Sequence, residues 1–139
     1  MLSRLIPFVA VLVPSVQCGV RGLFGYSMAG LFAIWAMGQT DRFSVCASCS
    51  GSLWYEGFFD YLQEHEPLAP CFIYLSLGEG EEHVKNAYFA RVGDETRRIA
   101  DFLAASPMCR EVKLVWHPGR HQSSTLITVS LLLPLKYIF

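Results

Sequence analysis

The residue best suited to chemistry is a serine in a tight turn. Ser27 lies in the segment GYSMAG, between an apolar stretch that predicts a strand and another that predicts a buried helix. A sharp strand-to-helix turn lifts a serine hydroxyl off the strand end and needs small residues two positions away on each side, here Gly25 and Ala29. The context favours a nucleophilic serine over a simple Gly/Ser turn. The N–H of Met28, which opens the predicted helix, is then placed to stabilise an oxyanion.

A serine hydroxyl is a weak nucleophile until a base takes its proton, and the sequence offers four histidines. His117 and His121 follow the last predicted strand, where the order serine, acid, histidine places a base. His121 is the predicted base, because a Pro-Gly pair before it shapes a loop that can return over the sheet. His117 is predicted to pack at the strand end, and His65 and His83 to lie on the surface.

The carboxylate that orients the base is expected in the loop after the third predicted strand, which reads GEGEE. Glu79, Glu81 and Glu82 compete for the role. Such a carboxylate must reach over the strand end to accept the imidazole N–H. Periodicity alone does not choose among adjacent loop residues, and at least two of the three are expected to be solvated.

The elements that must position these side chains follow from short apolar runs that alternate with longer segments of helical period. This alternation predicts βα units and a parallel sheet. Strands are predicted at about 20–26, 43–49, 71–77 and 112–116, and helices at about 28–37, 57–64 and 94–104.

Composition limits the other possibilities. The chain has 139 residues, 53% of them hydrophobic, and a net charge of −1, so it can bury a core but has no basic block for nucleic acid. One domain is expected over residues 1–139. Pro7 and Pro14 interrupt the apolar start, which argues against a signal peptide. Pro134 and Lys136 interrupt the apolar tail, so no membrane span is expected.

Five cysteines, an odd number, lie mostly in apolar surroundings: Cys18, Cys46, Cys49, Cys71 and Cys109. This usage predicts free buried thiols, a reducing compartment and a cytoplasmic location. Cys46 and Cys49, with His117 and His121, imitate a zinc site. The two pairs are too far apart in sequence for a zinc finger, and thiols three residues apart on a strand point to opposite faces. No metal is expected.

These residues, in this order, resemble the putative-esterase branch of the α/β-hydrolases, which includes enterochelin and related siderophore esterases. The phrases that carry the resemblance are RGLFGYSMAGLFAIWA, FSVCASCSGSLWYEGFFDYL, IYLSLGEGEE and VKLVWHPGRH, and together they cover about residues 21–121. The resemblance implies a three-layer α/β sandwich with a parallel sheet of about four strands, a partial α/β-hydrolase fold.

The resemblance also implies residue roles. Ser27 would be the nucleophile and His121 the general base. Glu81 fits the family's acid best, with Glu79 where many relatives carry Asp. Trp54 and Tyr55, on the loop beside the serine turn, would touch substrate, and aromatic packing under that loop is the alternative.

The implied function is hydrolysis of a small-molecule carboxylic ester through a serine acyl-enzyme, without metal or cofactor. An acyltransferase and a non-catalytic fragment or interaction module are the alternatives. The family has several strands before the serine turn, and their loop supplies a second oxyanion N–H. We expect the chain to lack these strands and therefore to be a poor esterase with an open sheet edge that favours self-association.

Overall fold

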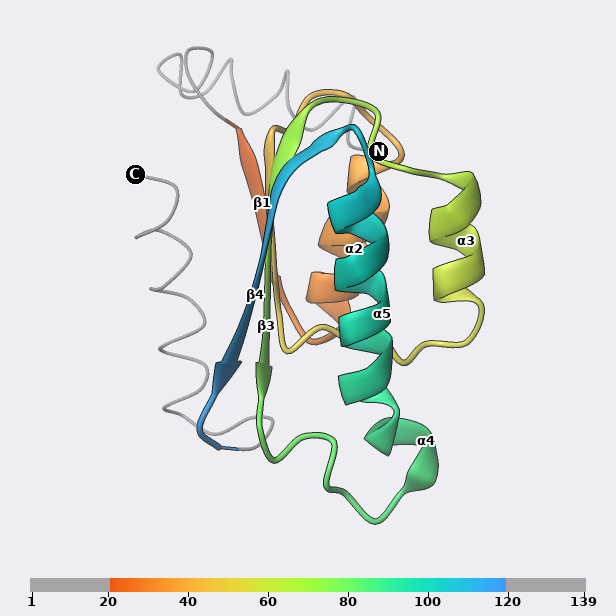
Figure 1. The fold of residues 1–139 in the computed structure, drawn as a ribbon, viewed down its shortest axis with the longest axis vertical. Helices are drawn as coiled ribbons and strands as arrows, with labels where there is room; N and C mark the ends of the chain where they lie inside the picture. The colour runs from red at the N-terminus through yellow and green to blue at the C-terminus, as the bar shows by residue number, and fades with distance from the viewer. Residues whose placement is uncertain (1–20, 120–139) are drawn as a thin grey trace.

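The computed structural model describes residues 21–119, and its elements alternate between strands and helices (Figure 1). They are β1 (Gly22–Tyr26), α2 (Met28–Met37), β2 (Val45–Cys49), α3 (Phe58–Glu64), β3 (Cys71–Gly78), α4 (Ala87–Ala90), α5 (Val92–Ala105) and β4 (Cys109–His117).

The four strands form one parallel sheet in the order β1-β2-β3-β4, as the alternating pattern predicted. The predicted helices are also confirmed, α2 with the expected bounds. Two elements differ. β4 begins at Cys109, three residues early, because a register shift between Cys71 and Phe72 lets the first part of the strand pair out of step. The short helix α4 was not predicted.

One face of the sheet carries the helices. In β3, Ile73 and Leu75 point to this face and join a core cluster with Ile34 of α2, Leu62 of α3 and Leu103 of α5. Figure 1 shows α2, α3 and α5 on the same side of the sheet. Right-handed crossovers between strands that advance in one direction produce this arrangement.

The opposite face of the sheet is also apolar. Ala47, Cys49 and Tyr74 form a second, smaller cluster there. Phe24 and Phe72, on the same face, remain 47% and 44% exposed. Residues 21–119 therefore supply the sheet and one helical layer of an α/β fold.

The cysteines of the described residues are free and buried, as predicted, whereas Cys18 lies outside the described residues. Cys46 belongs to the helix-side cluster and Cys49 to the other, so their thiols diverge. Burial raises the pKa of the Cys49 thiol to about 11. The sulfur atoms of Cys71 and Cys109 lie 3.9 Å apart on neighbouring strands.

No helix within residues 21–119 has the length and apolar character needed to cross a membrane. Within the same residues, no group of three or more His, Cys, Asp or Glu side chains is arranged to hold a metal ion.

Candidate active site

Ser27 occupies a strained turn between β1 and α2. Its φ of 59° and ψ of −122° are a combination that residues with a side chain rarely adopt. Such strain persists only where the surroundings fix the backbone. Here the Ser27 N–H donates to the Cys49 carbonyl at 3.0 Å, and the Ser27 carbonyl accepts the N–H groups of Gly30 and Ser52, each at 3.0 Å.

The glycines of the turn are required by close approach of the backbone. A Cβ atom on Gly25 would lie 1.9 Å from the Ala29 carbonyl oxygen, which cannot move without breaking the turn. A Cβ atom on Gly30 would lie 2.7 Å from the Ser48 Oγ and 3.0 Å from the Gly51 Cα. The small residues that the sequence showed around Ser27 therefore have a steric cause.

Met28 is the first residue of α2, directly after the serine. Its N–H is one of the helix-start donors that have no partner within a helix, and no acceptor for it lies within residues 21–119. The positive end of the helix dipole adds to its attraction for negative charge. The predicted oxyanion donor is thus placed next to the serine, at a helix start.

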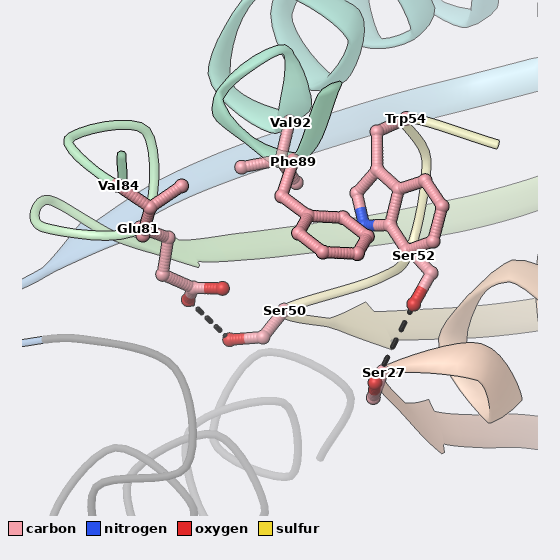
Figure 2. A pocket seen from close by; sticks show the side chains of 8 residues that line it. All are labelled: Ser27, Ser50, Ser52, Trp54, Glu81, Val84, Phe89 and Val92. Atoms are coloured by element: carbon pink, nitrogen blue, oxygen red, sulfur yellow. Dashed lines mark hydrogen bonds between the residues drawn. The ribbon is translucent and has the colours of Figure 1, made fainter. Parts of the chain in front are cut away.

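A cavity of about 380 Å³ opens at the carboxyl ends of the strands, which is where parallel α/β sheets usually bind ligands (Figure 2). Its lining consists of Ser27, Ser50, Ser52, Trp54, Glu81, Val84, Phe89 and Val92.

One wall of the cavity is polar. The hydroxyl oxygens of Ser27 and Ser52 lie 3.4 Å apart (Figure 2). The Ser50 hydroxyl donates to the Glu81 Oε1 at 2.7 Å, and the Gly78 N–H donates to the same oxygen at 2.7 Å. Ser50, like Ser27, has a positive φ, here 45°. A serine and a hydrogen-bonded carboxylate thus share one cavity.

Neither a protein-family model nor a curated protein matches the chain. Solved structures do: siderophore hydrolase EstB from Aspergillus nidulans, with a TM-score of 0.72 and 16% identity, matches 94% of this chain and 55% of its own. Siderophore hydrolase EstA from the same organism, with a TM-score of 0.65 and 21% identity, matches 86% of this chain and 48% of its own.

The chain has a partial α/β-hydrolase fold. The predicted partial α/β fold with a parallel sheet of about four strands is therefore confirmed, and residues 21–119 supply its sheet and one of its helical layers (Figure 1). The chain spans about half the length of the two siderophore hydrolases.

The three candidate acids on the loop of this α/β-hydrolase fold have different surroundings. Glu81 is 5% exposed and lines the cavity. Glu79 is exposed, and its N–H donates to the His117 carbonyl at 2.8 Å. Of the two glutamates that the resemblance favours, Glu81 is the one whose carboxylate reaches the cavity.

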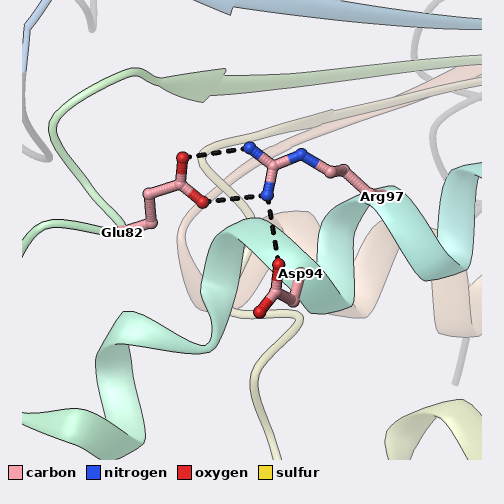
Figure 3. Close-up of polar contacts among 3 residues, drawn as sticks. All are labelled: Glu82, Asp94 and Arg97. Carbon is pink, nitrogen blue, oxygen red and sulfur yellow. Dashed lines mark hydrogen bonds and ion pairs between the residues drawn. The ribbon is translucent and has the colours of Figure 1, made fainter.

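Glu82 does not line the cavity, and its carboxylate faces Arg97 on α5 (Figure 3). Arg97 donates to its two carboxylate oxygens at 2.9 and 3.0 Å and to Asp94 at 3.3 Å. The Arg97 guanidinium holds the pKa of Glu82 below its ordinary value. A Cβ atom on Gly93 would lie 1.8 Å from the Glu82 Oε2, so the glycine makes room for this carboxylate at the start of α5.

No histidine within residues 21–119 lines the cavity. His117 is buried on the sheet face opposite the helices, with its Nε2 3.4 Å from the Tyr74 hydroxyl, and burial lowers its pKa. His65 is exposed and stacks on Tyr61, and His83 is exposed. The predicted base, His121, lies outside the described residues.

The second wall of the cavity is apolar, and much of it was not predicted. Trp54 lines it, whereas Tyr55 is 53% exposed and does not line the cavity. Val84, Phe89 and Val92 complete this wall. Val84 and Phe89 lie in a polar segment between β3 and α5, and their apolar character in that setting was the signal that sequence reasoning passed over.

Proposed function

We propose that this chain carries the nucleophile and the acid of a serine hydrolase that cleaves carboxylic esters. The observation that carries the proposal is the Ser27 turn: a serine held at a positive φ beside a helix start, with its side chain in the cavity. A strained backbone at a concave polar site is typical of catalytic serines in strand-to-helix turns.

In the proposed reaction, a base takes the Ser27 hydroxyl proton while Oγ attacks the ester carbonyl carbon. The Met28 N–H stabilises the negative charge that develops on the carbonyl oxygen. The C–O bond then breaks, the base returns its proton to the leaving alcohol, and the acyl group stays on Ser27. Water, activated by the same base, then attacks the acyl group, which leaves Ser27 as a carboxylic acid. No metal or cofactor takes part.

We propose His121 as the base and Glu81 as the acid that orients it. The backbone around the acid loop supports this pairing. The N–H groups of Glu79 and Gly80 donate to the carbonyls of His117 and Gly119, at 2.8 and 2.9 Å. The chain just before position 121 thus runs against the loop that carries Glu81.

Esters of siderophores are the first substrates to test, because the two solved structures compared above are siderophore hydrolases. An acyltransferase is the alternative within the same chemistry, since an alcohol can replace water at the acyl-enzyme. Adding alcohol acceptors during turnover separates the two reactions. Buried free thiols also support our proposal of a reducing, cytoplasmic location.

The activity of the chain alone is proposed to be low. The chain spans about half of each siderophore hydrolase, and this fold takes a second oxyanion N–H from a loop that precedes the serine turn. Loss of one such donor lowers rates by about 10²- to 10³-fold. β1 lies at one end of the strand order, and we propose that its edge favours self-association, which sedimentation would detect.

The test is hydrolysis of p-nitrophenyl butyrate and of a siderophore ester by the full chain, alone and with the N-terminal half of EstB added. Ser27→Ala should remove the activity that either preparation shows. Ser52→Ala is the matched control, because its hydroxyl lies 3.4 Å from that of Ser27 in the same cavity. Equal activity in wild type and Ser27→Ala would overturn the proposal and favour a non-catalytic chain.

A further inference from the structure

The apolar wall of the cavity is built from rings in edge-on contact. The ring centroid of Trp54 lies 4.9 Å from that of Phe89, with an angle of 71° between the planes (Figure 2). The Tyr88 ring meets Trp54 similarly, at 5.2 Å and 67°. Rings at such angles offer a further ring both faces and edges to contact, the arrangements that aromatic groups prefer.

Two side chains of this wall remain open to solvent. Phe89 is 45% exposed and Val84 39%, and Tyr88, which contacts Trp54 but does not line the cavity, is 38% exposed. Single exposed apolar residues are common on proteins, but a group at one cavity marks a binding surface. The three lie within one short segment that ends against α5.

The charge of the lining narrows what can bind. Of the residues within 21–119 that line the cavity, Glu81 is the one with an acidic side chain, and its carboxylate accepts hydrogen bonds from Ser50 and Gly78. No Lys or Arg of this part of the chain lines the cavity. Among the residues 21–119, an anionic group would therefore meet a carboxylate without a compensating cation, whereas a neutral group meets rings and aliphatic carbon.

The size of the cavity fits one ring beside the reacting ester. Its volume is about 380 Å³, and a closed cavity of about 150 Å³ is enough to bind benzene. Trp54 and Phe89 stand across the cavity from the Ser27 side chain (Figure 2). A ring between them and an ester carbonyl at Ser27 can belong to the same small molecule.

We infer that Trp54 and Phe89 form a subsite for a neutral aromatic group of the ester, with Phe89 as the specificity-determining residue. The identity of the reacting bond rests on the proposed esterase function. Binding of the ring does not, because it depends only on the apolar wall.

The first experiment compares two covalent probes on the full chain, an ethyl and a phenyl fluorophosphonate. Phe89→Ala should lower the second-order labelling rate of the phenyl probe about tenfold more than that of the ethyl probe. Tyr55→Ala is the matched control: Tyr55 also neighbours Trp54, at 6.3 Å between ring centroids, but does not line the cavity. In Tyr55→Ala, the ratio of the phenyl to the ethyl labelling rate should stay within about twofold of wild type.

The second experiment needs no nucleophile. In Ser27→Ala, titration with 4-nitroacetanilide, a neutral and unreactive aromatic amide, should quench tryptophan fluorescence saturably. Trp54→Phe should abolish this saturable quenching and Phe89→Ala should weaken it, with Tyr55→Ala again as the control.

The outcomes separate the two proposals. If Phe89→Ala lowers the labelling rates of the phenyl and ethyl probes equally and Ser27 is still labelled, the subsite is overturned. The esterase proposal then still stands. Saturable quenching through Trp54 without labelling of Ser27 would support the subsite and count against the esterase. A titration with no saturable quenching overturns the subsite whatever the probes do.

Discussion

The serine turn and the acid loop bring polar groups to the same cavity by different means. Ser27 is held by backbone: its own N–H and carbonyl are both hydrogen-bonded, and Gly25 is pressed against the next turn. Glu81 depends on side chains as well as on backbone. The Ser50 hydroxyl and the Gly78 N–H both donate to its carboxylate, and Arg97 links the neighbouring Glu82 to α5.

The difference predicts how each region responds to change. A site fixed by backbone contact tolerates no added atom but is insensitive to salt and pH. A site that also depends on side-chain hydrogen bonds and an exposed ion pair loses part of its stability each time one side-chain partner is removed. Salt also weakens it by screening the ion pair.

The largest effect is expected at Gly25. In Gly25→Ala the new Cβ would meet the Ala29 carbonyl at 1.9 Å, so the turn must break. We expect a loss of about 3 kcal/mol or more in the free energy of unfolding, measured by urea denaturation. Gly57→Ala is the control. Gly57 has a φ of 77° but nothing within 4 Å of its Cβ position, so about 1 to 2 kcal/mol is expected. Similar losses in both would mean that the turn is not tightly packed.

The next effect separates the acids. Glu81→Gln should lower the rate at which a fluorophosphonate labels Ser27 by about 10²-fold or more, because an amide cannot stabilise the imidazolium. Glu79→Gln is the matched change at an exposed side chain on the same loop. The labelling rate of Ser27 in this variant should stay within about twofold of wild type. A larger loss in Glu79→Gln would assign the acid to Glu79.

A smaller effect is expected from the ion pair behind the acid loop. Arg97→Met removes the two hydrogen bonds from the guanidinium to the Glu82 carboxylate. Because the Arg97 side chain is 45% exposed, the free energy of unfolding should fall by less than about 1 kcal/mol, and by less still in high salt. Arg110→Met, at an exposed residue on β4, is the control. A loss above about 2 kcal/mol would show that the acid loop depends on this pair more than an exposed ion pair allows.

The smallest effect concerns pH. Burial lowers the pKa of His117 in the folded chain, so below the ordinary value of 6.5 the unfolded chain binds the proton more readily. The contribution of neutral His117 to the free energy of unfolding is therefore fully present above pH 6.5. It is lost as the pH falls through the lower pKa of the folded chain. His117→Gln should flatten this part of the stability curve between pH 7.5 and 5, and His83→Gln, in an exposed loop, should not. An unchanged slope in His117→Gln would refute the assignment.

The sequence predicted the sheet, its main helices and the serine turn because each has a local cause. Apolar runs set the strands, and the small residues around Ser27 reflect steric contacts within a few positions. The start of β4 at Cys109 was missed because a register shift depends on pairing with β3, which local pattern does not encode.

The rest of the site depends on contacts between distant segments. Sequence pattern alone left Glu79, Glu81 and Glu82 as rivals. Their surroundings differ because Ser50 lies 31 positions before Glu81 and Arg97 lies 15 positions after Glu82. Phe89 was missed because it lies in a polar segment and lines the cavity only beside Trp54. The role of His121 stays a prediction.

The most direct test of the central claim is peptide mapping by mass spectrometry after brief treatment of the full chain with the ethyl fluorophosphonate. We expect a single modified serine, Ser27, with Ser50 and Ser52 unmodified although all three line the same cavity. Modification of Ser50 or Ser52 at a similar rate, or labelling that persists in Ser27→Ala, would contradict it.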